Sequence, residues 1–183
     1  MSTNLRLHLP RLSLSLGGGA FFALALQIIA FNAPLGDDVP RRVLLLLSYV
    51  VLIGFVAVNL RRIGISIIGI GLLLNFVAIA ANGGLMPVTA ETLAHGGFPS
   101  DVSVGEWVPG SKDVLLSRDD VRLWFLSDRF VLEALPRTLA YSLGDVIILM
   151  GLVVFLGEML LPRISRAKAP TPGSDSQPQN GDA

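Results

Sequence analysis

The chain has 183 residues, of which 52% are apolar and 15% are charged, whereas a soluble domain carries about 25% charged residues. Its net charge is zero, with 14 basic and 14 acidic residues, so it lacks the basic character of a nucleic-acid-binding protein. It contains no cysteine and only two histidines, which excludes disulfides, thiolate chemistry and cysteine-based or histidine-rich metal sites. We therefore expect no metal and no cofactor.

The charged residues leave long apolar stretches between them. None occurs in 12–36, 43–60 or 63–90, and a fourth stretch, 138–157, is interrupted only by Asp145. A bilayer core about 30 Å thick requires about 20 helical residues. We therefore predict an all-α membrane protein, a bundle of four transmembrane helices at about 14–31, 43–60, 63–81 and 143–161. The first stretch is longer than the apolar core of a signal peptide, so we expect its helix to be retained.

The remaining segments are an N-terminus at 1–13, a long outer segment at 82–141 and a polar tail at 162–183 whose composition indicates disorder. With four spans, both termini and the Arg61-Arg62 turn share one side of the membrane. Most basic residues near the spans lie on that side, which predicts a protein of the cell membrane with both termini in the cytoplasm. Arg41 and Arg42 count against this orientation.

The outer segment contains signals for short helices. Thr89 can cap a helix over 90–95, and residues 97–112 indicate a loop or a weak hairpin. Ser117 and Asp120 have the spacing of a capping box before 121–126, which includes Trp124 and Phe125. Aromatic residues beside a membrane are typical of interfacial elements. We therefore expect short interfacial helices in this third and longest loop.

Few polar residues occur within the predicted spans. Asn75 shares a helical stripe with small residues at 64, 71 and 78, and Gln27 shares another with small residues at 19, 23 and 30. Their amides are natural partners of each other or contacts for a ligand, and helix packing is the favoured interpretation. Asn82, Gly83 and Gly84 indicate the end of the third helix, because Asn and Gly tolerate positive φ.

The fourth span begins and ends with an acidic residue. Ser142 can cap this helix, and Asp145 is then at its third position, where a carboxylate favours the helix dipole. Glu158 is in the last turn, where we expect it to pair with the nearby arginines. About a dozen residues separate the two acids, roughly 20 Å along a helix, so they cannot act on the same bond.

Three strings resemble a known family. They are Gly71-Leu72-Leu73-Leu74-Asn75, Asn82-Gly83-Gly84-Leu85-Met86-Pro87-Val88 and Ser142-Leu143-Gly144-Asp145. In their order the chain resembles, over about 14–161, a family of bacterial multi-pass membrane proteins known as domain of unknown function 5317. It departs from the family pattern at 98–110, which looks like an insertion, and where Ser127-Asp128 replaces Gly-Asp. The resemblance implies a multi-pass membrane protein and brings no activity, cofactor or catalytic residue.

Three classes of function are compatible with this sequence. The absence of a catalytic motif favours a non-catalytic membrane component, an accessory or scaffold protein whose partners are the lipid bilayer and a membrane protein or second copy of the chain. The alternatives are a binder or carrier of a small or lipidic molecule, and an interfacial enzyme that acts on a lipid-linked substrate with Asp128, Asp145 and Arg122. We predict no catalytic and no metal-binding residue. The candidates for ligand binding or helix packing are Gln27, Asn75, Asn82, Gly83, Gly84, Met86, Pro87, Asp128 and Asp145.

Overall fold

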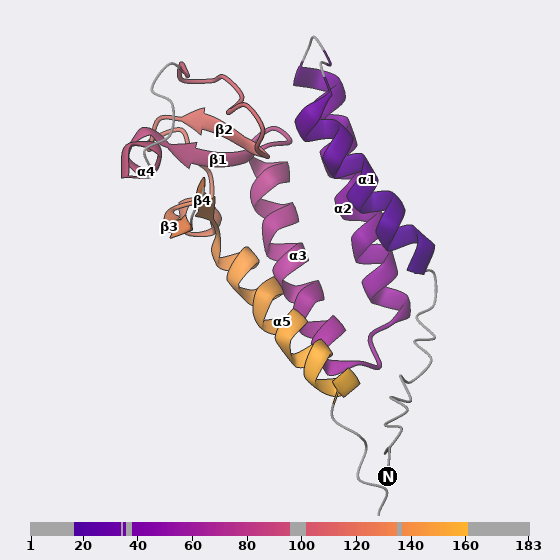
Figure 1. Cartoon of the computed structure of the whole chain (residues 1–183). Helices are drawn as coiled ribbons and strands as arrows, with labels where there is room; N and C mark the ends of the chain where they lie inside the picture. Colours follow the sequence, from indigo (N-terminus) through magenta and orange to yellow (C-terminus); the bar gives the residue numbers. More distant parts are fainter. Residues whose placement is uncertain (1–16, 34, 36–37, 96–101, 135–136, 161–183) are drawn as a thin grey trace, which may run out of the picture.

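The structure is a computed structural model that describes residues 17–33, 35, 38–95, 102–134 and 137–160. The predicted N-terminal segment 1–13 and the tail 162–183 lie outside these residues. Four long helices are present in the described part of the chain: α1 (Gly17–Asn32), α2 (Asp38–Val58), α3 (Ile63–Ala81) and α5 (Leu143–Leu160) (Figure 1). The last three are long and apolar enough to cross a membrane, whereas α1 has 16 described residues and is shorter.

The described helices begin and end within a few residues of the predicted spans except at the start of α2, and residues 14–16 and 161 lie outside the described part. This helix begins at Asp38 and not at residue 43. Asp38 lies in its first turn and forms ion pairs with Arg41 at 3.9 Å and Arg42 at 3.7 Å. A carboxylate in the first turn and acid–base pairs three or four residues apart both stabilise a helix. The apolar stretch therefore defines the part of α2 that suits a bilayer, and the helix extends beyond it.

The helices pack in the order α1, α2, α3, α5, and the contact between α3 and α5 is the most extensive (Figure 1). Glycines make this contact close. A Cβ atom added at Gly71 would lie 2.5 Å from the carbonyl oxygen of Gly144, and one added at Gly151 would lie 2.6 Å from the backbone nitrogen of Ile68. Close backbone approach through small residues is a common basis of helix association in membranes. The predicted stripe on α3 therefore faces α5.

Glu158 closes this helix pair at the opposite end from Asp145. Its Oε1 accepts a hydrogen bond of 3.0 Å from the backbone nitrogen of Ile63, the first residue of α3. The first backbone N–H groups of a helix lack partners within it, and a carboxylate there also favours the helix dipole. Glu158 thus caps α3, a contact different from the arginine pairing that we expected.

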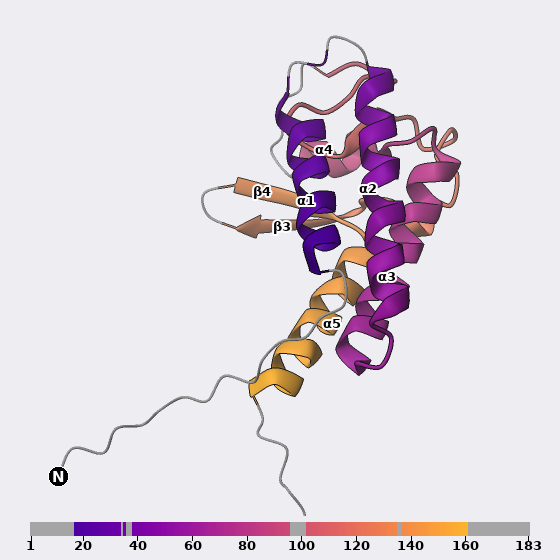
Figure 2. The same cartoon turned by 90° about the vertical axis from the view of Figure 1, so that its right-hand side faces the viewer.

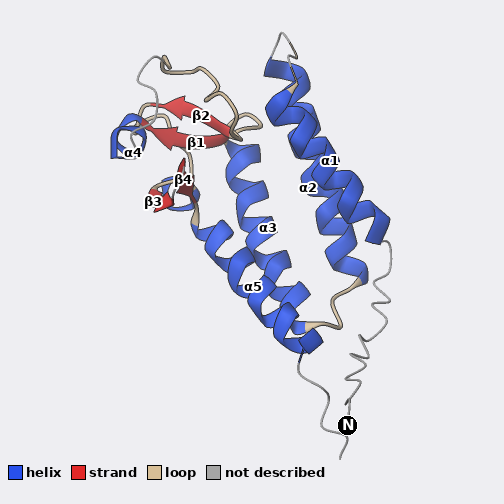
Figure 3. Ribbon diagram, in the orientation of Figure 1, coloured by secondary structure: helices blue, strands red, loops and turns tan. Residues whose placement is uncertain are grey.

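The outer segment contains strands, so the all-α prediction does not hold for it. Four strands lie at the end of the bundle where α3 ends and α5 begins (Figure 3). Strand β1 (Met86–Thr89) pairs in parallel with β2 (Asp113–Leu116), and β3 (Phe130–Ala134) pairs antiparallel with β4 (Arg137–Tyr141). The β3–β4 hairpin lies across the direction of the helices (Figure 2). All four residues of β1 are buried, so this strand shows no polar–apolar alternation that a sequence could reveal.

One of the two predicted short helices is present. Helix α4 (Ala90–His95) begins after Thr89, whose Oγ1 accepts a hydrogen bond of 3.4 Å from the backbone nitrogen of Thr92. The prediction of a helix over 121–126 is wrong, because only the 3₁₀ helix η1 (Trp124–Leu126) forms there. The side chain of Asn82 binds both backbone groups of Arg122, at 2.9 Å and 2.8 Å. These groups are then not available to a longer helix.

The bundle and the outer segment share one hydrophobic core. Apolar residues of α2 and α3 pack in the same cluster as Leu85, Met86 and Val114 of the outer segment and Leu126 of η1. A second, smaller cluster lies within the outer segment and contains Val88, Leu93, Val108 and Leu115. Burial of these side chains fixes the outer segment to the bundle as a module with a defined position.

Candidate functional site

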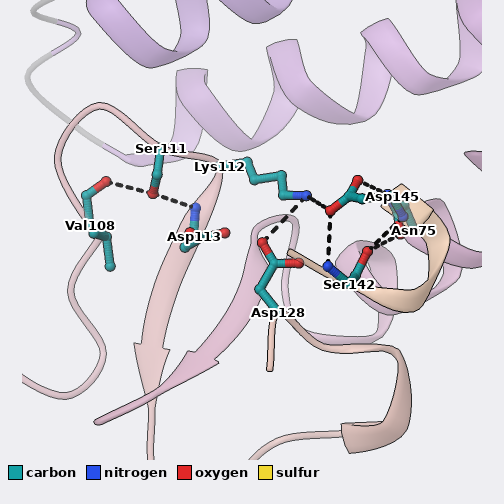
Figure 4. A network of polar contacts seen from close by, with 8 residues as sticks. All are labelled: Asn75, Val108, Ser111, Lys112, Asp113, Asp128, Ser142 and Asp145. Carbon is teal, nitrogen blue, oxygen red and sulfur yellow. Dashed lines mark hydrogen bonds and ion pairs between the residues drawn. The ribbon is translucent and has the colours of Figure 1, made fainter. Parts of the chain in front are cut away.

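Lys112 connects the outer segment with helix α5. Its backbone oxygen, just before β2, accepts a hydrogen bond of 2.9 Å from Met86 of β1. Its Nζ lies 2.7 Å from Asp145 Oδ2 and 3.4 Å from Asp128 Oδ2 (Figure 4). The side chain of Lys112 is 19% exposed and that of Asp128 is not exposed at all. A single ammonium group therefore bridges a carboxylate of the outer segment and one of α5.

Asp145 combines the predicted helix cap with contacts that the sequence did not indicate. The backbone nitrogen of Ser142 donates to Asp145 Oδ2 at 3.0 Å, and that of Asp145 donates to Ser142 Oγ at 3.1 Å. This is the reciprocal bonding of a capping box. Asn75 Nδ2 donates to the other carboxylate oxygen, Oδ1, at 2.7 Å. Asp145 is therefore held by its own helix, by α3 and by Lys112.

Asn75 lies in the contact between α3 and α5, beside the first turn of α5. It is fully buried, and its Oδ1 accepts a hydrogen bond of 2.8 Å from Ser142 Oγ. A Cβ atom at Gly144 would overlap the Asn75 side chain, so the glycine is needed for this approach. Asn75 is seven residues before Asn82, where α3 ends; this corresponds to about 10 Å along a helix. Helix α5 thus begins beside the last turns of α3, below its end.

Asp113 and Asp128 form a second acidic contact. Their carboxyl groups face each other and lie close enough to interact (Figure 4). Asp113, the first residue of β2, is 5% exposed, and Asp128 is 1% exposed. Asp128 is positioned by its backbone nitrogen, which donates to Pro87 of β1 at 3.1 Å. Strand β1 thus positions both acids, through its pairing with β2 and through this bond.

Burial and charge change the protonation of these groups. Burial opposes the charge of Lys112, but the carboxylates of Asp128 and Asp145 outweigh it and hold the pKa of Lys112 well above its ordinary value. Burial raises the pKa of Asp128 well above its ordinary value, opposed by Lys112 and reinforced by Asp113. Burial also raises the pKa of Asp113, again against the effect of Lys112. Lys112 therefore stays charged, beside two acids whose burial favours their protonated forms.

Tyr49 brings α2 into the same group of side chains. It is 5% exposed and lies close enough to Asn75 and Lys112 to interact with both. We refer to the complete group as the lysine–carboxylate network, which consists of Tyr49, Asn75, Lys112, Asp113, Asp128, Ser142 and Asp145.

Two arginines at the start of α2 also bind the outer segment, at contacts separate from the lysine–carboxylate network. The Arg41 guanidinium lies 3.5 Å from the centre of the Trp107 ring and donates a hydrogen bond to the Ala30 carbonyl at the end of α1. Arg42 Nη1 donates to the Gly83 carbonyl at 2.8 Å. Arg41 is only 5% exposed. Both arginines therefore serve contacts within the protein.

Several of the predicted candidate residues lie elsewhere. Gln27 does not pair with Asn75, because its Nε2 donates to Ser48 Oγ of α2 at 3.1 Å. Met86 and Pro87 are fully buried in β1.

Asn82, Gly83 and Gly84 end α3 as expected. The two glycines have φ of 79° and 98°, a region that L-residues rarely adopt. The backbone nitrogen of Gly84 donates to the Ile79 carbonyl at 2.8 Å, which satisfies one of the last carbonyls of the helix.

The structure brings Asn75, Asp128 and Asp145 together but replaces the expected cation. Arg122, which we expected beside the two acids, is exposed and binds Asn82 through its backbone. Lys112 takes that place, although no sequence motif pointed to it. One feature of the sequence could have pointed to it, because Lys112 is the only lysine before the tail. Within the described residues, no group of three potential metal ligands could hold a metal ion.

Comparison with known proteins identifies the class of this chain. The model of a family of unknown function, DUF5317, matches residues 11–157. This match covers most of the chain and includes every member of the lysine–carboxylate network, so the chain belongs to that family. No curated protein and no solved structure matches it.

Proposed function

We propose that this protein is a non-catalytic integral membrane component, in which a helix bundle carries a folded outer module that meets a partner. The observation that supports this function best is that Lys112 and Asn75 find their polar partners within the lysine–carboxylate network. The Lys112 ammonium group has two carboxylates as neighbours, and the Asn75 amide has a partner on each side. A buried polar group whose bonds are satisfied within the protein serves to specify and hold a structure.

In this proposal all four long helices cross the membrane. Three have the length and hydropathy of a span. The described part of α1 is shorter, but it is apolar and packs along α2. An even number of spans puts both termini on one side, and the basic residues near the spans favour the cytoplasm for that side. Arg41 and Arg42 oppose this count, yet their engagement with Trp107 and Gly83 gives them a different role.

The surface that we propose for the partner is the exposed turn around η1. Leu123, Trp124 and Phe125 are 37%, 37% and 56% exposed. The guanidinium groups of Arg118 and Arg129 lie 4.8 Å and 4.6 Å from the centre of the Trp124 ring. Aromatic residues and arginine are enriched at protein–protein interfaces. The partner is a membrane protein or a second copy of this chain.

One observation favours an interfacial enzyme as the second candidate. Asp128 and Asp145 converge on a cation, as that function requires, although the cation is Lys112. A catalytic acid or base must reach a substrate, whereas Asp128 is fully buried. The carrier hypothesis has less support, because it needs unpaired amides at Gln27 and Asn75 and both are paired.

Crosslinking in native membranes tests the proposal. A photo-crosslinking residue at Phe125 should give a discrete adduct with one membrane protein or with a second copy of the chain. The matched control is Val104, an apolar residue of the outer segment that is 61% exposed and lies outside the proposed surface. Equal adducts at both positions, or lipid adducts alone at Phe125, would contradict the partner surface. A lipid-linked molecule retained in native mass spectra and released by Asp145→Asn would favour the enzyme.

A further inference from the structure

The contact between Asp113 and Asp128 lacks a hydrogen-bond donor. Asp113 Oδ1 and both side-chain oxygens of Asp128 are buried and accept no hydrogen bond from any described residue. Lys112 lies 3.4 Å from one Asp128 oxygen, but its short contact is to Asp145 at 2.7 Å. Two ionised carboxylates can only accept hydrogen bonds. Their contact becomes a hydrogen bond only when one of them carries a proton.

The charges around this contact do not balance without a proton. Three carboxyl groups, those of Asp113, Asp128 and Asp145, surround the ammonium of Lys112. If every group were ionised, two negative charges would be in excess, and the charges of Asp113 and Asp128 would both be buried. A buried carboxylate without a partner takes up a proton in preference to remaining charged. When two carboxylates share a site, one of them has a strongly raised affinity for the proton.

The other titratable groups that face the pair are few. Within the described part of the chain they are Lys112 beside it, Asp145 from α5 and Tyr49 from α2. His95 does not belong to this group, because it lies exposed on α4 and its ring binds the carbonyl of Glu91. Lys112 favours the ionised acid, whereas burial and Asp145 favour the protonated one.

We propose that Asp113 and Asp128 form a binding site for one proton, held between their carboxyl groups in the outer module. The protonated acid donates its O–H to the other carboxylate and so connects β2 with the chain that follows η1. Lys112 extends this connection to Asp145 of α5. Loss of the proton places a second negative charge beside the first, and the module becomes less firmly attached to the bundle.

The direction of the pH effect follows from the same contacts. A carboxyl group whose pKa is raised by folding binds its proton more tightly in the folded state. It therefore contributes stability that is fully present below the ordinary Asp pKa of about 4. This stability is lost as the pH rises through the pKa that the group has in the folded protein. The site thus makes attachment of the outer module stronger in acid and weaker in alkali.

Infrared spectroscopy of the complete protein in mild detergent tests the site directly. The carbonyl stretch of a protonated carboxylic acid should be present at neutral pH and should vanish on alkaline titration. It should be absent from Asp128→Asn and from Asp113→Asn and unchanged in Asp119→Asn, which alters an exposed acid. A folded protein without this band at neutral pH would overturn the proposal, as would a band that both site variants retain.

A stability measurement keeps the test independent of the infrared assignment. Asparagine resembles a protonated aspartate in shape and can donate a hydrogen bond, so Asp128→Asn should fold. Its melting midpoint should vary less with pH than that of the unchanged protein between about pH 5 and pH 8. Equal pH dependence in both would contradict the site. If the infrared band occurs only when sodium is replaced by choline, a cation occupies the site and the proton proposal fails.

Discussion

Replacement of Lys112 by methionine tests whether the lysine–carboxylate network stabilises the fold. Methionine keeps an unbranched apolar side chain but removes the ammonium group that lies 2.7 Å from Asp145 and 3.4 Å from Asp128. Removal of one partner from a buried ion pair is destabilising by about 3–5 kcal/mol. The Asp145 side chain is 29% exposed and keeps Asn75 and Ser142 as donors. We therefore expect the lower value, about 3 kcal/mol.

Thermal unfolding in mild detergent measures this loss. For a chain of this size, 1 kcal/mol corresponds to a change in the melting midpoint of about 2–4 °C, so Lys112→Met should lower the midpoint by about 6–12 °C. The matched control is Arg118→Met. Arg118 is an exposed cation that pairs with Glu91 at 3.9 Å, and loss of such a pair changes stability by about 0–1 kcal/mol.

A second substitution separates charge from packing. In the double variant Lys112→Met with Asp128→Asn, the unpaired carboxylate is also removed, so part of the lost stability should return. The loss of stability in Lys112→Met should also be smaller in acid. Without the ammonium group, Asp128 binds its proton more tightly in the folded protein. A carboxyl group whose pKa is raised by folding contributes stability that is lost as the pH rises. If Lys112→Met melts like the Arg118→Met control at neutral pH, the reasoning about the network is refuted.

Three further predictions concern the helix contacts. Asn75→Leu should lower the melting midpoint, because it leaves hydrogen-bonding groups on α5 without a partner, each a loss of about 1–3 kcal/mol; an unchanged midpoint would show that the amide is dispensable. Gly71→Ala should reduce the yield of folded protein. The control Gly54→Ala should be tolerated, because a Cβ atom there would meet nothing within 4 Å. Size-exclusion profiles of the two variants measure the yields, and equal yields would contradict close packing. Glu158→Ala should destabilise the protein by about 0.5–2 kcal/mol through loss of the α3 cap, as measured by thermal unfolding. Glu158→Gln should retain part of the cap. An alanine variant as stable as the original protein would contradict the capping role of Glu158.

The helices were predictable because a long stretch of apolar residues without charges favours a helix of the length that a bilayer requires. The bounds 63–81 for α3 needed only hydropathy and the Asn82-Gly83-Gly84 end signal. The capping role of Asp145 also followed from local spacing. Both features depend on neighbours within a few residues, which a sequence displays directly.

The strands and the network were not predictable in this way. Strand β1 pairs with β2, which begins 27 residues after β1 does, from Met86 to Asp113, and both strands are too short and too buried to show a period of two residues. Asn75 and Asp145 are 70 positions apart, and Lys112 and Asp145 are 33 positions apart. Which cation joins the acids depends on where the chain returns to the bundle. The arginine expected beside these acids, Arg122, is held elsewhere, because its backbone binds Asn82.

The reactivity of Lys112 toward amine reagents can also report when the lysine–carboxylate network opens. The chain contains only two lysines, Lys112 and Lys168, and the second lies outside the described residues. Amine-reactive acylating reagents require an accessible and unprotonated amine, whereas Lys112 is 19% exposed and held as an ammonium ion by its neighbours. Acylation of the peptide that carries Lys112 should therefore occur only in molecules whose network has opened. The rate of this acylation then measures how often the outer module detaches, and no substitution in the chain is needed.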